Sequence, residues 1–301
     1  MKTAVLRTGA IGDLIVTASA LKKYSEIFTG EEITVFCGRS CIDAVKNLPY
    51  TVNTFDDGRL YHGGISGMVS TAFGLIRSLR GFDKVFVLHS DLRWCMLPFL
   101  AGCGQISTMR GLSGSGRIYQ CLGIAPSAEH YFIPDSKPSI PEKPYTAIAP
   151  GGGRNIHRDD QCRRWAGFKE LIRMISAEHN VVLLGSESDS PEMTGVLDMC
   201  GKTSLSDAYH IIDGAELFIG NDSGLLHLAA CTDTPAIGIY TATTPDLMPD
   251  NVTAVRSGLP CSPCEKNGRF STSCKCECTS SISTEDVMKV INGLILSGES
   301  A

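Results

Sequence analysis

The sequence predicts an α/β protein built from two Rossmann-like domains with parallel sheets, and three observations lead to this class. Short apolar segments alternate with helix-length amphipathic segments along the whole chain. Glycine makes up 31 of 301 residues, many of them where an apolar segment ends, as tight strand-to-helix turns require. A proline-rich stretch at 133–144 separates two halves of this kind, so we place the domains at 1–143 and 144–301.

The first half alternates strands with helices. Apolar runs predict strands at 3–7, 33–37, 84–88 and 106–109. Amphipathic stretches between them predict helices at 14–28, 65–79 and 91–100. Strands that look buried on both faces and alternate with helices imply a parallel sheet with right-handed crossovers.

The second half has the same pattern. Its strands are predicted at 145–149, 180–184, 217–220 and 236–240. Its helices are predicted at 165–178, 191–200, 205–212, 224–230 and 284–296. Ligands of such sheets bind outside the carboxyl ends of the strands, so the turns at those ends are the places to look for function.

Composition excludes several classes of protein. A net charge of −5 with 43% hydrophobic residues excludes a disordered chain, and no apolar run reaches the ~18 residues of a membrane span. Charged residues interrupt the apolar start, so we expect no signal peptide and a cytoplasmic protein. The first half has 15 basic and 12 acidic residues, whereas the second half has 12 basic and 20 acidic residues. The weak basic excess of the first half would suit an anionic glycan. We expect no nucleic-acid partner.

The first glycine-rich turn follows the first predicted strand. Gly9 and Gly12 let the backbone turn sharply and approach a ligand, and Asp13 stands at the start of the following helix. Asp13 is either a plain helix cap or a group that faces the sheet edge. A nicotinamide-linked oxidoreductase is disfavoured, because the third glycine of the dinucleotide-binding motif is missing.

The second glycine-rich turn, in the second half of the chain, points to an anion site. Gly151–Gly153 follow the strand at 145–149 and precede a polar stretch with five cations. These cations are Arg154, His157, Arg158, Arg163 and Arg164. Backbone N–H groups beside guanidinium forks suit a phosphate. A solvated basic loop without a ligand is the alternative explanation of the same pattern.

The third turn is the most informative. The strand at 217–220 ends in Asn221, Asp222, Ser223 and Gly224, and a helix begins at once. A helix N-terminus stabilises a phosphate, and His227 lies about one turn into the helix. The alternative is an ordinary Asp/Ser cap with a packed histidine.

Four stretches, in order along the chain, resemble the heptosyltransferase family, glycosyltransferase family 9. The matching residues are Arg7 with Gly12 and Asp13, then Pro150 and Gly151 with Arg163, Arg164 and Trp165, then Leu184 and Gly185 with Asp189, and last Asn221 to Ala230. The last stretch is the family's Asn-Asp-Ser/Thr-Gly-x-x-His-x-Ala-Ala signature, and it is intact. The resemblance covers nearly the whole chain and implies the glycosyltransferase-B arrangement, two domains that face a cleft.

The resemblance also implies roles. The N-terminal half takes the acceptor and the C-terminal half takes the nucleotide-sugar donor. Asp13 falls on the base that removes the acceptor hydroxyl proton during inverting transfer. Arg163 falls on a phosphate-binding lysine, with Arg158 and Arg164 as alternatives, and Asp189 falls on an acid that holds ribose hydroxyls, with Glu187 as a nearby substitute. The residues expected to bind the donor are Gly12, Arg163, Arg164, Asp189, Asp222, Ser223, Gly224 and His227.

The expected activity is therefore transfer of a sugar, heptose by family default, from a donor such as ADP-heptose to a glycan or lipopolysaccharide-type acceptor. No cofactor or catalytic metal is expected. We expect contact with the inner face of a membrane through the acceptor, without a transmembrane segment. The alternative function is a non-catalytic regulatory protein on the same scaffold that binds a nucleotide-sugar or a metal.

Thirteen cysteines are many for a chain without a secretion signal, and five of them lie close together. These five are Cys261, Cys264, Cys274, Cys276 and Cys278. The spacing fits a structural zinc or iron site, but we favour a structural loop with reduced or locally paired thiols. The eight other cysteines are expected to be scattered and buried.

Overall fold

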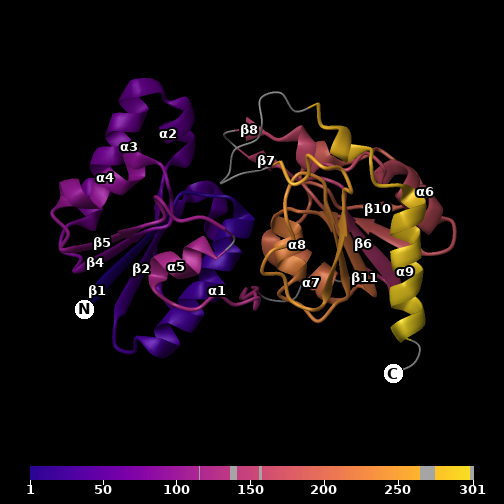
Figure 1. Ribbon diagram of the computed structural model, residues 1–301, viewed down its shortest axis with the longest axis horizontal. Coiled ribbons are helices and arrows are strands. Elements are labelled where there is room, and N and C mark those ends of the chain that lie inside the picture. The colour runs from indigo at the N-terminus through magenta and orange to yellow at the C-terminus, as the bar shows by residue number, and fades with distance from the viewer. Residues whose placement is uncertain (115, 136–140, 156–157, 265–274, 299–301) are drawn as a thin grey trace. The chain divides into compact units, whose positions relative to one another are not determined.

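The chain forms two compact units, residues Met1–Ile133 and Pro134–Ala301 (Figure 1). The computed structural model describes residues 1–114, 116–135, 141–155, 158–264 and 275–298. Each unit is a parallel sheet covered by helices, so the predicted fold class is confirmed. Along the chain, the boundary between the units falls at the first residues of the predicted proline-rich linker.

The first unit contains a five-stranded sheet in the order β3-β2-β1-β4-β5, and all its neighbouring strands are parallel. Its strands are β1 Lys2–Arg7, β2 Glu32–Gly38, β3 Thr51–Phe55, β4 Lys84–Val87 and β5 Gln105–Thr108. The central strands β1, β2 and β4 are buried almost throughout, as their apolar runs predict. The edge strand β3 was not predicted, because four of its five residues are at least partly exposed and its pattern is polar.

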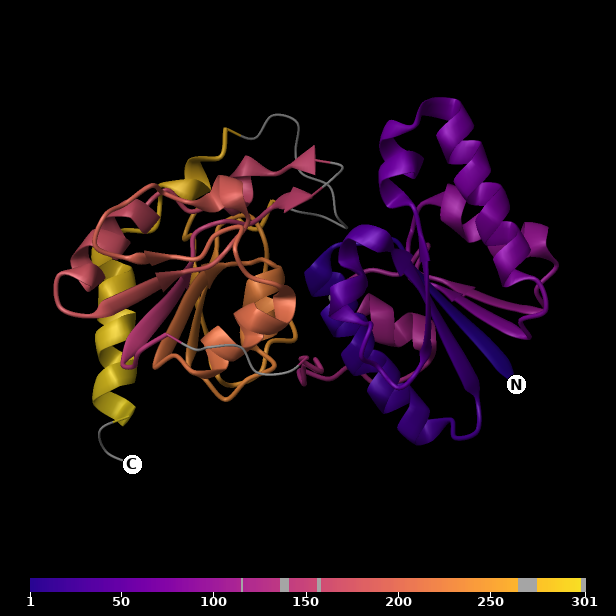
Figure 2. The same cartoon turned by 180° about the vertical axis from the view of Figure 1, so that it is seen from behind.

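Helices cover both faces of this sheet. They are α1 Ile11–Ile27, the 3-10 helix Arg39–Ala44, α2 Asp57–His62, α3 Gly64–Leu79, α4 Leu92–Ala101 and α5 Arg117–Leu122. Helix α1 packs against α5, and α3 packs against α4, and Figures 1 and 2 show these pairs on opposite sides of the sheet. Apolar side chains of α3 and α4, among them Leu75 and Trp94, fill the core beneath them.

The second unit contains a six-stranded parallel sheet in the order β10-β9-β6-β11-β12-β13. Its strands are β6 Tyr145–Ala149, β9 Asn180–Leu183, β10 Leu197–Asp198, β11 Leu217–Asn221, β12 Ala236–Tyr240 and β13 Val252–Arg256. Counted along the unit, this order is 3-2-1-4-5-6, the doubly wound order of dinucleotide-binding domains. A short antiparallel ribbon, β7 Arg154–Asn155 with β8 Arg158–Asp159, lies outside the sheet.

The helices of the second unit match the prediction with one exception. They are α6 Phe168–Ser176, α7 Leu205–Asp213, α8 Gly224–Ala229, α9 Thr284–Gly298 and the 3-10 helices Gln161–Arg163, Glu187–Asp189 and Glu277–Thr279. The helix predicted at 191–200 is wrong, because this segment is an irregular loop that leads into the short strand β10. Glu192 and Gly195 both have positive φ, a backbone conformation that no helix accommodates.

The topology selects one place in each unit for a ligand. In the first sheet the strand order reverses between β1 and β4, and in the second between β6 and β11. Parallel sheets bind ligands at these points, where the loops from the two strands diverge to opposite faces. The glycine-rich turns singled out in the sequence follow β1, β6 and β11. In the described part of the chain, no helix has the length and apolar character that a membrane crossing requires.

Candidate functional site

At the switch point of the first sheet, Asp13 is held by a buried arginine. The N-cap of α1 is Ala10, which makes no side-chain capping bond, and Asp13 lies in the first turn of the helix. Its Oδ2 forms an ion pair with Nη2 of Arg7, while Nη1 of Arg7 donates to the carbonyl of Leu88 at the end of β4. The Asp13 side chain is 45% exposed, so it has a fixed position and remains accessible. The helix-cap interpretation of Asp13 is therefore wrong.

The turn before Asp13 is strained. Ala10 has φ 61° and ψ 128°, a conformation that non-glycine residues rarely adopt, and Gly9 before it has φ 141°. Such strain costs about 1–3 kcal/mol and persists where the surrounding fold enforces it, commonly at functional sites. The distorted turn lets α1 begin directly beside the end of β1.

His89 completes this group, which sequence reasoning missed. Nδ1 of His89 accepts a hydrogen bond from the backbone N–H of Asp91 (3.0 Å). Burial, with the positive charge of Arg7, lowers the pKa of His89 to about 4, so the ring is neutral at pH 7. His89 could have been found from the sequence, because it directly follows the strand predicted at 84–88 and so lies at the same sheet edge as Asp13.

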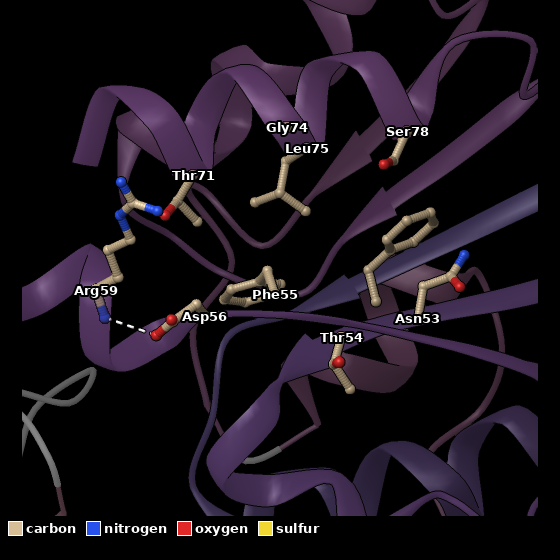
Figure 3. A pocket seen from close by; sticks show the side chains of 10 residues that line it. Asn53, Thr54, Phe55, Asp56, Arg59, Thr71, Gly74, Leu75 and Ser78 are labelled. Carbon is tan, nitrogen blue, oxygen red and sulfur yellow. Dashed lines mark hydrogen bonds between the residues drawn. The ribbon is translucent and has the colours of Figure 1, made fainter. Parts of the chain in front are cut away.

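A pocket of about 360 Å³ lies in the first unit between β3 and α3 (Figure 3). Its lining residues are Phe36, Asn53, Thr54, Phe55, Asp56, Arg59, Thr71, Gly74, Leu75 and Ser78. Arg59 and Asp56 lie at one end of the pocket, where the Arg59 backbone N–H donates to Asp56 (2.7 Å). Aromatic rings beside hydroxyl and amide groups make a mixed lining of the kind that binds small polar ligands. The sequence did not predict this pocket, because it did not predict β3.

At the switch point of the second sheet, Asn221 joins three segments. Its Nδ2 donates to the carbonyls of Pro150 (2.8 Å) and Gly151 (3.0 Å), and its Oδ1 accepts from the backbone N–H of Trp165 (3.0 Å). The side chain is fully buried, so these bonds are made without competition from water. Asn221 therefore fixes the glycine turn after β6 against the segment that carries the arginines.

Asp222 is the electrostatic centre of this site. Nη2 of Arg163 contacts Oδ2 of Asp222 at 2.5 Å and the Asp222 carbonyl at 3.1 Å, and Nε2 of His227 lies 3.8 Å from Oδ1. Burial by itself would raise the pKa of Asp222, but Arg163 and His227 outweigh it and hold the pKa below its ordinary value. The carboxylate is thus kept ionised, and it holds the Arg163 guanidinium beside one of its oxygens and the His227 ring near the other.

The glycine turn after β6 is shaped by close contacts. A Cβ on Gly151 would overlap the carboxylate of Asp189, and a Cβ on Gly153 would meet the carbonyl of Asp160. Asp189 also accepts from the backbone N–H (2.9 Å) and hydroxyl (2.6 Å) of Ser186, as part of a capping box. Asp189 therefore lies against the glycine turn.

Two buried hydroxyl groups flank Asp222 without a hydrogen-bond partner among the described residues. They belong to Ser223 and to Tyr240 at the end of β12. Burial raises the pKa of Tyr240, so the phenol keeps its proton. Unsatisfied buried donors cost free energy and are a feature of sites that bind polar ligands.

The structure brings together most of the residues predicted to bind the donor. Arg163, Asp222, Ser223, Gly224 and His227 lie at one place, the end of β11 and the start of α8. Arg164 donates to the carbonyl of Gly152 (3.1 Å), so it supports the glycine turn. Gly12 lies in the first unit, apart from this group along the chain. His157 and the side chains of Arg154 and Arg158 lie outside the described residues.

The cysteine segment braces the loop that carries Arg163. Cys276 forms a disulfide with Cys162, which precedes Arg163, although Cys162 was expected to be an isolated buried cysteine. The Trp165 indole N–H donates to the carbonyl of Ile282 (2.9 Å), and the N–H of Ala166 to that of Thr279 (2.9 Å). The cysteine segment therefore holds the arginine loop against the end of the second sheet.

A metal site was the less favoured alternative for these cysteines, and in the described part of the chain no three His, Cys, Asp or Glu side chains are grouped to hold a metal ion. Cys276 is in the disulfide, and Cys274 lies outside the described residues. The described thiols therefore do not form the four-thiolate arrangement that the spacing allowed.

Replacing Cys276 by Ser tests this bracing. We expect a loss of about 2–4 kcal/mol in the free energy of unfolding, because the disulfide closes a loop of 114 residues, together with weaker binding of ADP. Thermal melts without and with ADP measure the two effects, and mass spectrometry of alkylated protein with and without reductant reports the state of the disulfide. Cys261→Ser is the matched control, an exposed cysteine of the same segment. Equal melts for the two variants, or stoichiometric iron or zinc in the purified protein, would contradict the bracing role of a disulfide.

Comparisons with known proteins agree with one another. The profile of glycosyltransferase family 9 (heptosyltransferase) matches residues 126–274. The chain is 24% identical to lipooligosaccharide heptosyltransferase 2 of Haemophilus influenzae, over 85% of this chain and 88% of that protein.

Solved structures share the fold. The ADP-heptose lipopolysaccharide heptosyltransferase II of E. coli superposes with a TM-score of 0.69 at 18% identity, over 99% of this chain and all of that one. The iron-containing dodecameric glycosyltransferase TibC of enterotoxigenic E. coli superposes with a TM-score of 0.70 at 18% identity, over all of this chain and 80% of that one. The family profile, the curated relative and the shared fold all support one conclusion, a heptosyltransferase-like protein of glycosyltransferase family 9.

Proposed function

We propose that the protein is an inverting glycosyltransferase that transfers heptose from ADP-heptose to a lipopolysaccharide-type acceptor. The relatives' names supply the sugar, the donor and the acceptor class. The observation that carries the catalytic part of the proposal is Asp13, an accessible carboxylate fixed by a buried arginine at the switch point of its sheet.

In the proposed reaction the Met1–Ile133 unit binds the acceptor and the Pro134–Ala301 unit binds the donor. Asp13 takes the proton of the acceptor hydroxyl as its oxygen attacks the anomeric carbon of the heptose. The bond from that carbon to the diphosphate oxygen breaks, and ADP leaves with the electron pair. General base catalysis by a positioned carboxylate contributes about 10²–10⁴-fold to such a step. Arg7 is the positioning residue for Asp13.

In the donor unit, Arg163 and the start of α8 stabilise the charge that grows on the leaving diphosphate. The buried Ser223 hydroxyl is available to the donor, and Asp189 receives the ribose hydroxyls. Asp222 orients Arg163 and His227 for this task. A guanidinium and backbone N–H groups supply the positive charge, so the proposed step includes no metal.

The pocket between β3 and α3 is proposed to receive part of the acceptor. Phe36 and Phe55 offer apolar surface for a sugar face, and Arg59 offers a cation to an anionic substituent. Both features suit a charged glycan.

Release of ADP from ADP-heptose, measured with and without a heptose-deficient lipopolysaccharide acceptor, tests the proposal. We expect acceptor-dependent release with inversion at the anomeric carbon, and a rise of the melting temperature with ADP or ADP-heptose alone. Donor binding without turnover on any acceptor would instead indicate a non-catalytic nucleotide-sugar-binding protein. No thermal shift with any nucleotide-sugar would refute the donor site.

A further inference from the structure

The outer surface of α3 and α4 is apolar to an extent found nowhere else among the described residues. Of the thirteen large apolar side chains that are exposed, eight lie on these two helices. They are Ile65, Met68, Val69 and Phe73 on α3 and Leu92, Met96, Phe99 and Leu100 on α4. We call these eight side chains the α3/α4 apolar surface.

The surface follows from helical spacing. Ile65, Val69 and Phe73 recur every four residues along α3 and so form one stripe. Met96 and Leu100 follow Leu92 in the same way along α4. The two helices pack against each other and lie side by side in both views of the molecule (Figures 1 and 2).

These residues are not needed by the core of their own unit. Leu75, Leu79, Trp94 and Leu97, on the inner sides of the same helices, are buried there and already fill the space over the sheet. By contrast, the Phe73 and Phe99 side chains are 66% and 68% exposed. Such a concentration of exposed apolar side chains on two neighbouring helices of a folded unit marks a place where another surface binds.

Charge identifies the kind of partner. Neither α3 nor α4 contains an acidic residue, whereas α1, α6 and α9 all do. Arg77 lies near the end of α3 and Arg80 directly after it; both are exposed, and neither forms an ion pair among the described residues. The same surface on a second copy offers no acidic residue of α3 or α4 to pair with these arginines, which disfavours self-association. An anionic lipid surface satisfies both features, since it accepts apolar side chains and attracts cations.

The surface also lies suitably for a lipid-linked acceptor. In a parallel α/β sheet the helices run opposite to the strands, so the N-terminal ends of α3 and α4 are at the same sheet edge as Asp13. We propose that the α3/α4 apolar surface docks on a bilayer of anionic phospholipid. In this way the acceptor unit meets a lipid-anchored acceptor at the membrane surface. The link to the acceptor rests on the proposed function, but the docking itself does not.

Vesicle flotation with the full chain tests the docking. We expect binding to mixed phosphatidylcholine–phosphatidylglycerol vesicles, weaker binding to pure phosphatidylcholine, and weakening by salt, because the Debye length falls from about 10 Å at 0.1 M to about 3 Å at 1 M. Phe73→Ser/Phe99→Ser is expected to lower the partition coefficient by at least about tenfold. Arg77→Gln/Arg80→Gln is expected to remove mainly the preference for phosphatidylglycerol.

The matched control is Met174→Ser/Leu197→Ser, which removes two comparably exposed apolar side chains (43% and 47%) from the second unit. This variant is expected to bind vesicles like the wild type. Equal binding by the Phe73/Phe99 variant and the wild type would overturn the proposal. An equal loss of vesicle binding in the control variant would also overturn it. The same holds if the wild type binds no vesicles and light scattering shows that it forms a dimer, which the Phe73/Phe99 substitutions disperse.

The same measurements separate this inference from the proposed enzyme activity. Asp13→Asn is expected to bind vesicles like the wild type, because Asp13 is not part of the surface. Vesicle binding that follows the apolar surface in a protein without transferase activity would refute the proposed function and leave the docking intact. Transferase activity on the lipid-linked acceptor with no vesicle binding would refute the docking and leave the proposed function intact.

Discussion

Asp13→Asn is expected to reduce the rate of heptose transfer by about a thousandfold while the affinity for ADP stays unchanged. The amide has nearly the shape of the carboxylate, but it cannot accept the proton of the acceptor hydroxyl, and general base catalysis is worth about 10²–10⁴-fold. Asp13 belongs to the Met1–Ile133 unit, whereas the residues proposed to bind ADP belong to the other unit. The rate is measured as acceptor-dependent ADP release, and the affinity by thermal shift with ADP.

Asp43→Asn is the control for this substitution. Asp43 is an exposed acid of the same unit with a surface ion-pair partner, Lys46, at 3.0 Å, and such pairs contribute little to stability. We expect wild-type transfer from this variant. If Asp13→Asn transferred heptose at the wild-type rate, Asp13 would not be the base. A loss of ADP binding in Asp13→Asn would show that the substitution disturbs more than the chemical step.

Asp13 could be found from the sequence because its signals are local. A buried apolar strand, two glycines and an acid at a helix start occur within a dozen residues, and the strand order then brings this turn to a switch point. The same holds for the turn from Asn221 to Gly224. The fold class follows from the same alternation, which is why the central strands of both sheets were predicted.

Edge strands could not be found in this way. β3 and β13 have half-exposed residues in mixed order, and neither shows the apolar run of a buried strand nor the strict alternation of a half-buried one. The pocket between β3 and α3 was missed for that reason. The helix predicted at 191–200 was wrong because apolar spacing outweighed Gly195, whose positive φ ends any helical path.

Partners that are distant in the chain could not be predicted either. The bonds of Asn221 to Pro150 and Gly151, and the disulfide between Cys162 and Cys276, join segments about 70 and 114 residues apart. No spacing rule connects such positions in one sequence, because only the folded sheet brings them together. Sequence patterns therefore supplied candidate residues, and the structure was needed to show which distant residues hold them in place.

Arg163→Met is expected to affect both stability and donor binding, because Arg163 neutralises the buried carboxylate of Asp222. Removing one partner of a buried ion pair leaves an uncompensated charge and costs about 3–5 kcal/mol. Loss of a charge-assisted contact to phosphate is expected to weaken ADP binding by about 10–100-fold. Urea unfolding measures the first effect and titration with ADP the second.

The double variant Arg163→Met/Asp222→Asn separates the two effects. A neutral amide at position 222 no longer needs the guanidinium, so most of the lost unfolding free energy should return. ADP binding should stay weak, because the cation for the diphosphate is still missing. Recovery of ADP binding together with stability would show that Arg163 acts only by holding the fold, and it would remove Arg163 from the donor site.

The contribution of Asp222 to stability is expected to depend on pH with opposite signs in the wild type and in Arg163→Met. In the wild type the pKa of Asp222 is held below its unfolded value of about 3.9, so its stabilisation is complete above that pH and is lost as the pH falls through the lower folded pKa. Without Arg163, burial dominates and the folded pKa of Asp222 rises above the unfolded value. The folded variant then binds more protons than the unfolded chain between the two values, so its stability falls as the pH rises.

The deficit of Arg163→Met relative to the wild type should therefore shrink as the pH is lowered from 7 towards about 4. His227 and Tyr240 also face Asp222; burial raises the pKa of Tyr240, so the phenol keeps its proton over this pH range, and the comparison is repeated in a His227→Gln background. The double variant should show no such change, because position 222 then has no proton to bind. A deficit that is equal at both pH values in Arg163→Met would mean that lost packing, and not the buried charge of Asp222, accounts for the instability.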